Sequence, residues 1–215
     1  MKNAKYFWFA PYVALALFHL AVIALENWDL VALTKPLLMP VLLIGLLPFI
    51  KKSKLAISVT VIIAIVFSWL GDVLLQSPGE IGFLIGLGMF LLAQISYIVT
   101  FVKTQKPRLH WSITIFALWY IALVAALAPS LGGLLAPVLV YGLVLASMAT
   151  LAARLGPVIA TGGILFFASD SMLALNRFLP GFNLPYSDLL IMSTYVAAEG
   201  LLVFGLASKI FIHAK

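Results

Sequence analysis

The sequence predicts an all-α fold, a polytopic membrane helix bundle with eight transmembrane helices in a single domain, residues 1–215. Hydrophobic residues make up 64% of the chain and charged residues only 9%, whereas a soluble domain has about 25% charged residues. Apolar runs of about 20 residues, the length that crosses a bilayer, recur along the whole chain. Lysine and arginine are concentrated in every second connection. Together these features predict that nearly all of the protein lies within the membrane.

Each predicted span is a mostly apolar run bounded by a short segment with Pro, Gly or charged residues. The first run follows Lys2 and Lys5, but it is longer than the apolar core of a signal peptide and no cleavage site follows, so we interpret it as a span. In chain order, the predicted spans are Phe7–Leu25, Leu30–Ile50, Leu55–Leu75, Ile81–Val102, Trp111–Ala128, Leu134–Ala153, Pro157–Asn176 and Ser187–Phe211. The bounding segments are Glu26–Asp29, Lys51–Lys54, Gln76–Glu80, Lys103–His110, Pro129–Gly133, Arg154–Gly156 and Arg177–Tyr186.

The charges predict the orientation of the bundle. Eleven of the thirteen Lys and Arg residues fall on the side of the N-terminus, whereas the other side has Arg177 in a connection and Lys35 just inside a span. Because positive charges stay in the cytoplasm, both termini are expected there, which requires an even number of spans. The net charge of +6 is then explained by topology and by anionic lipid headgroups. No nucleic-acid partner is expected.

The composition also excludes several kinds of site. The chain has no cysteine, so disulfides, thiol nucleophiles and thiolate metal ligands are absent. Its three histidines, His19, His110 and His213, are far apart in the sequence, and none has the spacing of a metal-ligating pair. We therefore expect neither a metal nor another cofactor.

Three acids interrupt the predicted spans: Asp72, Asp170 and Glu199. An acid at the centre of a bilayer costs about 2.5–3.5 kcal/mol on insertion scales, so such residues usually belong to a functional site. The directions of the spans place Asp72, Asp170 and Lys35 in one layer, in the outer third of the membrane. Glu199 is expected near the middle of the last span.

Other polar residues lie on helix faces that include these acids. Ser68, Asp72 and Gln76 follow one another at four-residue intervals, and Tyr195 lies one turn before Glu199. Each polar residue also has a purely structural interpretation. Lys35 can extend to the headgroups, Asp72 can face water, and Glu199 can be a protonated acid hydrogen-bonded between helices.

Gln94 and Tyr97 are expected in the inner half of the fourth span, where polar side chains more often hold helices together than form a site. The segment Gly71–Leu75 resembles Ser169–Leu173, and each is followed by a span with a polar residue and a tyrosine. A duplicated four-helix unit with parallel copies is one interpretation of this weak similarity.

Five motifs, read in order, resemble those of the YhhN-type lysoplasmalogenase family. They are Thr34-Lys35-Pro36 with Pro40, Gly71-Asp72 with Leu75, Phe83-x-x-Gly86-Leu87-x-x-Phe90 with Gln94 and Tyr97, Gly163-x-x-Phe166-x-x-Ser169-Asp170 with Leu173-Ala174, and Tyr195-x-x-Ala198-Glu199. The resemblance implies an eight-span enzyme that hydrolyses the vinyl ether of lysoplasmalogens to a fatty aldehyde and a glycerophospho-alcohol. It implies that Asp72 and Asp170 are the catalytic pair. Two positions depart from the family pattern, since relatives often have His at Gln94 and Gln at Glu199.

Vinyl ethers hydrolyse by acid catalysis, which two carboxylates in different environments can share. Our hypothesis is that Asp170, the more deeply placed, donates the proton and that Asp72 activates water, although the roles could be reversed. Lys35 could hold the substrate phosphate, and Glu199 could supply further protons. The expected substrate-binding residues are Lys35, Ser68, Gln94, Tyr97, Ser169, Tyr195 and Glu199.

The expected partners are a lysophospholipid substrate and the lipid bilayer, and the oligomeric state is left open. Two other classes of function also place acids at membrane depth. One is a small proton-coupled transporter, and the other is a membrane scaffold whose acids serve folding alone. The short connections and the absence of cysteine favour a bacterial inner membrane.

Overall fold

The computed structural model describes residues 3–50, 55–77, 79–106 and 110–212, and within these ranges it contains helices and no strands. The all-α fold is therefore confirmed. The α-helices are α1 (Ala10–Ala24), α2 (Trp28–Leu46), α3 (Leu55–Leu75), α4 (Glu80–Thr104), α5 (Ser112–Leu131), α6 (Leu135–Ala152), α7 (Pro157–Phe178) and α8 (Ser187–Leu206). Short 3₁₀ segments occur at Asn3–Phe9 (η1), Leu47–Phe49 (η2) and Gly132–Leu134 (η4), and a π segment (η5) follows α8 at Ala207–Ile212.

Seven helical segments in the described ranges are long and apolar enough to cross a membrane, and one of them is the 41-residue segment Ser112–Ala152. That segment contains both α5 and α6, which pack against each other and are separated by η4. Gly132 begins η4 with a φ of +50°, a conformation that glycine adopts without steric cost. The protein is thus a multi-pass membrane protein, whereas the count of eight spans and the cytoplasmic termini stay predictions.

Pro129 lies inside α5, although the sequence analysis placed it in the connection that follows the fifth span. A proline within a membrane helix is tolerated when neighbouring groups satisfy the backbone that it frees. The helix accordingly continues to Leu131 and turns only at Gly132. The assignment of Pro129 to a connection was therefore wrong.

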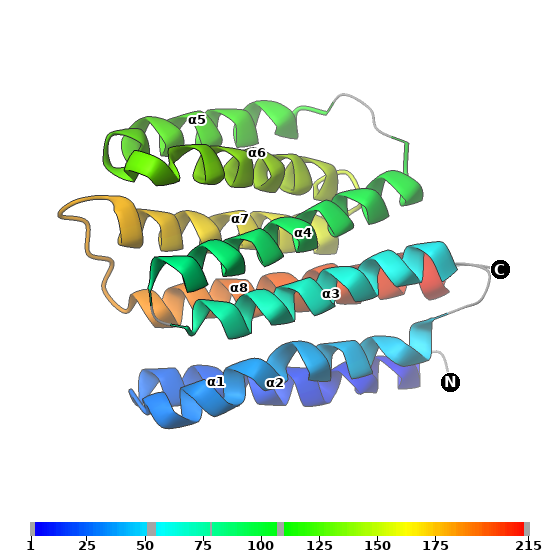
Figure 1. Cartoon of the computed structure of the whole chain (residues 1–215). Helices are drawn as coiled ribbons and strands as arrows, with labels where there is room; N and C mark the ends of the chain where they lie inside the picture. The colour runs from blue at the N-terminus through cyan, green and yellow to red at the C-terminus, as the bar shows by residue number, and fades with distance from the viewer. Residues whose placement is uncertain (1–2, 51–54, 78, 107–109, 213–215) are drawn as a thin grey trace.

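The helices form four layers (Figure 1). The pair α1 and α2 lies at one side of the bundle, the pair α5 and α6 at the other, and α3, α4, α7 and α8 fill the space between them. Within each half, the first helix packs on the second and the second on the third, while the third and fourth are the most closely associated. This repeated neighbour pattern, α1–α4 and α5–α8, agrees with the duplicated unit suggested by the sequence.

Glycines allow the closest helix pairs to approach each other. A Cβ atom at Gly71 of α3 would lie 2.6 Å from the ring of Phe90 in α4. A Cβ atom at Gly162 of α7 would lie 2.9 Å from the side chain of Leu202 in α8. These two contacts fix α3 on α4 and α7 on α8, and three of these four helices carry the acids Asp72, Asp170 and Glu199.

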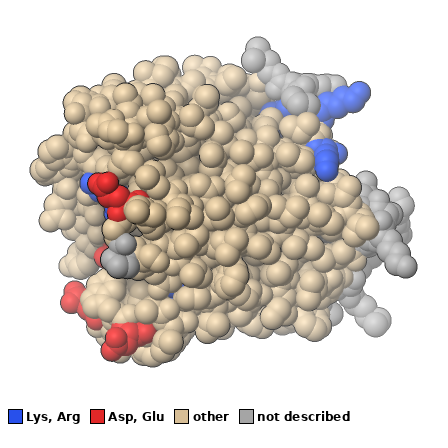
Figure 2. All heavy atoms as spheres, in the orientation of Figure 1, with Lys and Arg blue, Asp and Glu red and all other residues tan. Residues whose placement is uncertain are grey.

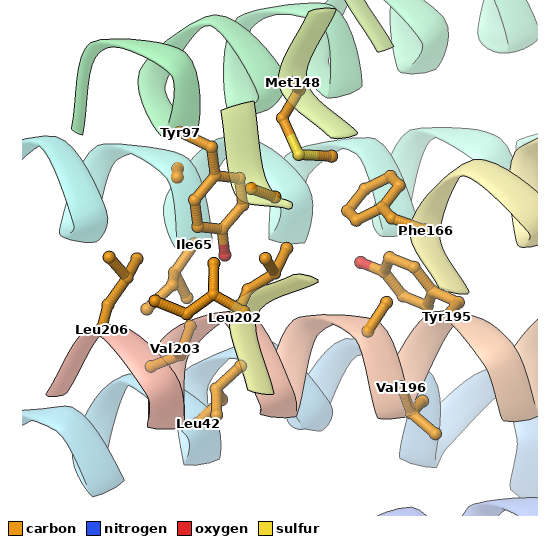
Figure 3. Packing of buried hydrophobic residues seen from close by; sticks show 14 of the residues in the cluster. Leu42, Ile65, Tyr97, Met148, Phe166, Tyr195, Val196, Leu202, Val203 and Leu206 are labelled. Atoms are coloured by element: carbon orange, nitrogen blue, oxygen red, sulfur yellow. The ribbon is translucent and has the colours of Figure 1, made fainter. Parts of the chain in front are cut away.

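The interior is packed with aromatic and aliphatic side chains, which include Tyr97, Phe166 and Leu202 (Figure 3). Many large hydrophobic residues are instead exposed, such as Phe7 at 76% and Trp111 at 69%. An apolar surface of this extent is expected of a protein surrounded by lipid.

Charged residues gather at the two ends of the bundle. Figure 2 shows the acids at one end of the visible face and the cations at the other, apart from a small group of cations beside the acids. The end with the acids contains the α1–α2, α3–α4 and α7–α8 connections, and the other end contains both termini. The cations Lys2, Lys51, Lys52, Lys54, Arg108 and Lys215 lie outside the described residues.

A side chain of α3 satisfies a carbonyl that proline frees in α2. Pro40 has no N–H to bond the carbonyl of Pro36, four residues earlier. The indole Nε1 of Trp69 donates to that carbonyl oxygen at 2.9 Å. This hydrogen bond fixes α2 on α3 next to Lys35.

Candidate active site

A cavity of about 280 Å³ opens between the helices at the acidic end. Its wall includes residues from α2 through α8, so no helix of the central layers is absent from it. The polar and charged lining residues are Lys35, Asp72, Tyr120, Tyr141, Ser169, Asp170, Arg177, Asp188 and Tyr195. Aliphatic and aromatic side chains of α4, α5 and α6 form much of the remaining wall, among them Leu87, Leu123, Leu127 and Leu145.

Asp72 lies three residues before the end of α3 and is only 2% exposed. The hydroxyl of Tyr195 donates to its Oδ2 at 2.8 Å. Lys35 Nζ lies 4.0 Å from its Oδ1. Asp72 is therefore a buried carboxylate with one neutral donor and one nearby cation.

Asp170 lines the same cavity from α7, and its partners are neutral. The hydroxyl of Tyr141, from α6, donates to its Oδ2. Gln94 Nε2, from α4, lies 3.4 Å from the same oxygen and donates to the Tyr141 hydroxyl at 2.8 Å. Three helices thus hold Asp170 in one position.

Gln94 is completely buried, yet its Oε1 has no hydrogen-bond partner among the described residues. A buried carbonyl oxygen without a partner is unfavourable, because the group has lost its hydrogen bonds with water. Gln94 Nε2 is already used for Tyr141 and Asp170. Its Oε1 is therefore a free acceptor next to the Asp170 carboxyl group.

Glu199 is completely buried and has both carboxyl oxygens engaged. Ser68 Oγ donates to Oε1 at 2.6 Å, and the Tyr97 hydroxyl donates to Oε2 at 2.5 Å. In Figure 3 the Tyr97 hydroxyl points from α4 toward α8. Ser68 lies one turn before Asp72, and Tyr195 one turn before Glu199, so α3 and α8 form two successive hydrogen bonds between the same helix faces.

The structure brings five of the predicted site residues to the cavity wall: Lys35, Asp72, Ser169, Asp170 and Tyr195. The hydroxyl of Ser169 donates to the Ile191 carbonyl at 3.0 Å, which ties α7 to α8. The other four predicted residues, Ser68, Gln94, Tyr97 and Glu199, do not line the cavity. They are buried next to it and bond to residues that do, or to one another.

Sequence reasoning missed four polar residues of the cavity wall, namely Tyr120, Tyr141, Arg177 and Asp188. Tyr141 lies in a run of apolar residues and appears as an ordinary core residue in the sequence. Arg177 was interpreted only as a charge in the connection after the seventh span, and Asp188 is the second residue of the predicted span Ser187–Phe211. The sequence did contain one indication, because Arg177 follows Asp170 by seven residues and Asp188 precedes Tyr195 by seven. Seven residues are about two helical turns, so each charge lies on the same helix face as a predicted site residue.

The chemistry of this arrangement follows from its charges and donors. Two carboxyl groups line one cavity, and one of them lies beside a cation while the other has neutral donors. Groups of this kind can divide a proton donor role and a water-activating role. Among the described residues, no group of three or more His, Asp or Glu side chains is placed to hold a metal ion.

Comparison with known proteins places these features in a family. The YhhN family model matches residues 30–206. The lysoplasmalogenase TMEM86B of Mus musculus is 34% identical over 141 residues, 65% of this chain and 60% of the relative. The Rattus norvegicus protein is 34% identical over 65% of the chain and 58% of the relative, and the Homo sapiens protein is 33% identical over 63% and 58%.

The chain thus spans about 60% of the length of the curated relatives that it matches. No solved structure shows a significant match. The family model covers all eight helices except α1 and the first residues of α2, and it includes each residue of the cavity wall. The chain therefore belongs to the YhhN family.

Proposed function

We propose that the protein is a lysoplasmalogenase-like hydrolase, which cleaves the vinyl ether of 1-alkenyl lysoglycerophospholipids. The observation that carries the proposal is the placement of Asp72 and Asp170 on the wall of one cavity, with the Lys35 cation 4.0 Å from Asp72. The names of the TMEM86B relatives support this reaction. The comparisons do not favour the transporter alternative.

The reaction consumes one water molecule. A proton adds to the β carbon of the vinyl ether, which leaves an oxocarbenium ion at the α carbon. Water adds to that carbon and loses a proton to a base. The resulting hemiacetal then breaks the bond between the α carbon and the glycerol oxygen, as its hydroxyl loses a proton and the glycerol oxygen gains one. The products are a fatty aldehyde and a glycerophospho-alcohol. Glycosidases use two carboxyl groups for a related transition state.

We assign the proton donor role to Asp170 and the base role to Asp72. Asp170 is surrounded by neutral donors, Tyr141 and Gln94, which fix its position without supplying a positive charge. Asp72 lies beside Lys35, which favours a negative carboxylate able to stabilise the cation and accept a proton from water. Reversed roles remain the alternative assignment.

The other predicted site residues have supporting roles in this scheme. Tyr195 donates to Asp72 and orients it. Ser68 and Tyr97 hold Glu199, and the Ser68–Glu199 hydrogen bond joins α3 to α8 one turn from the Tyr195–Asp72 hydrogen bond. Ser169 fixes α7 on α8 beside Asp170. The apolar wall, which includes Leu123 and Leu127, suits the hydrocarbon chain of the substrate.

The test is aldehyde release from a lysoplasmalogen by purified protein, with wild type compared with Asp72→Asn and Asp170→Asn. Each substitution should lower turnover by about 10²-fold or more, since acid–base groups contribute that much. Asp29→Asn is the matched control, because Asp29 lies at the same end of the bundle in the first turn of α2 and does not line the cavity.

If the Asp170→Asn protein released aldehyde at the wild-type rate, the proposed catalytic role of the carboxylate pair would be rejected. Absence of aldehyde from folded wild-type protein, with both ethanolamine and choline substrates, would reject the hydrolase itself. We also propose a bacterial inner-membrane location, which membrane fractionation of the source cells would test.

A further inference from the structure

Two oppositely charged side chains of the cavity wall have no role in the proposed reaction. Arg177 lies in the last turn of α7, and Asp188 is the second residue of α8. Both are exposed, and both line the cavity that contains Asp72 and Asp170. Neither forms an ion pair or a side-chain hydrogen bond with any residue that the structure describes.

Their helical positions place these charges above the acids rather than among them. Arg177 follows Asp170 by seven residues on α7, and Asp188 precedes Tyr195 by seven residues on α8. Seven residues are nearly two full turns, so each charge lies on the same helix face as the inner residue, about 10 Å nearer the helix end. The cavity therefore has an inner polar level and an outer charged level.

Aromatic contacts hold the guanidinium of Arg177 in place. Its central carbon lies 4.0 Å from the ring centroid of Phe83 and 5.8 Å from that of Phe178. The two rings contact each other edge to face at 5.6 Å. Stacking over a ring leaves the N–H groups at the guanidinium edge available to a planar or tetrahedral anion.

We propose that Arg177 and Asp188 form the headgroup site, in which Arg177 binds the phosphate of a zwitterionic lysophospholipid and Asp188 binds its ammonium. This inference rests on the proposed function, since it takes the substrate to be a lysophospholipid. Arginine matches phosphate oxygens with paired hydrogen bonds, and a carboxylate accepts hydrogen bonds from an ammonium. Lys35 then stays with Asp72 at the inner level.

The same contacts favour a primary ammonium over a trimethylammonium group. A trimethylammonium group is usually recognised by open aromatic faces. Here the Phe83 face is covered by Arg177, and the unpaired anion at this level is Asp188. A primary ammonium can donate hydrogen bonds to that carboxylate, whereas trimethylammonium has no N–H. The site therefore prefers phosphoethanolamine to phosphocholine.

The test measures binding, so it does not require turnover. Saturated 1-alkyl lysophospholipids, which lack the vinyl ether, are titrated into the purified full chain with three headgroups: phosphoethanolamine, phosphocholine and a phosphate monoester. Asp188→Asn should lower the affinity for the phosphoethanolamine lipid about fivefold, as expected for a partly exposed charge pair. The affinity for the phosphate monoester should stay unchanged. Arg177→Gln should weaken all three about tenfold, as expected for a charge-assisted hydrogen bond.

Two control variants match these substitutions. Asp29→Asn changes the second residue of α2, at the same end of the bundle but outside the cavity wall. Arg154→Gln changes an arginine that is bound to the Lys106 carbonyl and does not line the cavity. Both controls should bind all three lipids as wild type does. The affinity ratio between headgroups within one variant does not depend on the fraction of protein that is folded.

The proposal would be overturned if Asp188→Asn left the ratio of the affinities for the phosphoethanolamine lipid and the monoester unchanged. It would also be overturned if Arg177→Gln kept the wild-type affinity for all three lipids. These outcomes are distinct from failure of the hydrolase. Wild type that releases aldehyde but shows no headgroup effect in these variants would reject only the headgroup site. Wild type that shows the headgroup effect but releases no aldehyde would reject only the hydrolase.

Discussion

At the residue scale, Tyr141 links Gln94 to Asp170. It accepts a hydrogen bond from Gln94 Nε2 and donates one to Asp170 Oδ2. Tyr141→Phe should keep the fold, because the ring stays and only one hydroxyl is lost, at a cost of about 1 kcal/mol in the free energy of unfolding. Turnover of lysoplasmalogen should fall about tenfold or more, because Asp170 loses its best-placed donor.

The measurement for Tyr141→Phe is kcat and KM for aldehyde release, together with the pH profile of kcat. A positioning role predicts a lower kcat, a nearly constant KM and a displaced pH profile. A uniform loss of activity that follows the fraction of folded protein would show that Tyr141 serves packing alone.

The same residues show how far the sequence specifies the site. Asp72 and Asp170 could be identified as candidates because an acid in an apolar span is costly and therefore rare. Tyr141 could not, because a tyrosine among apolar residues is compatible with an ordinary core position, and its hydroxyl partners lie on α4 and α7. The free oxygen of Gln94 is likewise a property of three-dimensional packing.

At the element scale, the apolar runs predicted the helices well because membrane helices satisfy their own backbone hydrogen bonds. Their ends were less well predicted. Proline at position 129 marked the end of a span in the sequence, but α5 continues to Leu131 because the chain reverses at Gly132. The sequence also gave no direct sign that Trp69 satisfies the carbonyl freed by Pro40.

Gly162 should be essential for the α7–α8 pair. Gly162→Val would place Cβ 2.9 Å from the Leu202 side chain and 3.0 Å from its backbone nitrogen, so the helices must separate. Overpacking of this kind costs about 1–3 kcal/mol. The thermal unfolding midpoint in detergent should fall. Because α7 and α8 carry Asp170 and Tyr195, aldehyde release should fall with it.

Gly88→Ala is the control for that substitution. Gly88 also lies inside a helix, α4, but a Cβ atom there would meet nothing within 4 Å. Alanine favours helix over glycine, so this variant should be as stable as wild type or slightly more so. If Gly162→Val and Gly88→Ala destabilised the protein equally, close helix approach at Gly162 would not explain the loss of stability.

At the scale of the whole molecule, the two four-helix halves place one catalytic candidate each on corresponding helices, Asp72 on α3 and Asp170 on α7. Each of these aspartates also has a partner from across the boundary between the halves. Tyr195 of α8 bonds Asp72, and Gln94 of α4 approaches Asp170. The cavity therefore requires both halves, which the short similarity between Gly71–Leu75 and Ser169–Leu173 does not by itself predict.

The orientation of the bundle is open to a direct test because the chain has no cysteine. Glu26 lies at the acidic end, in the α1–α2 connection, and Lys106 follows α4 at the end that has the termini. If positive charges are cytoplasmic, Glu26→Cys should react with a membrane-impermeant maleimide in intact cells. Lys106→Cys should react only after the membrane is permeabilised. The reverse pattern would place the cavity mouth, and with it Arg177 and Asp188, in the cytoplasm, so the lipid would have to enter from the inner leaflet.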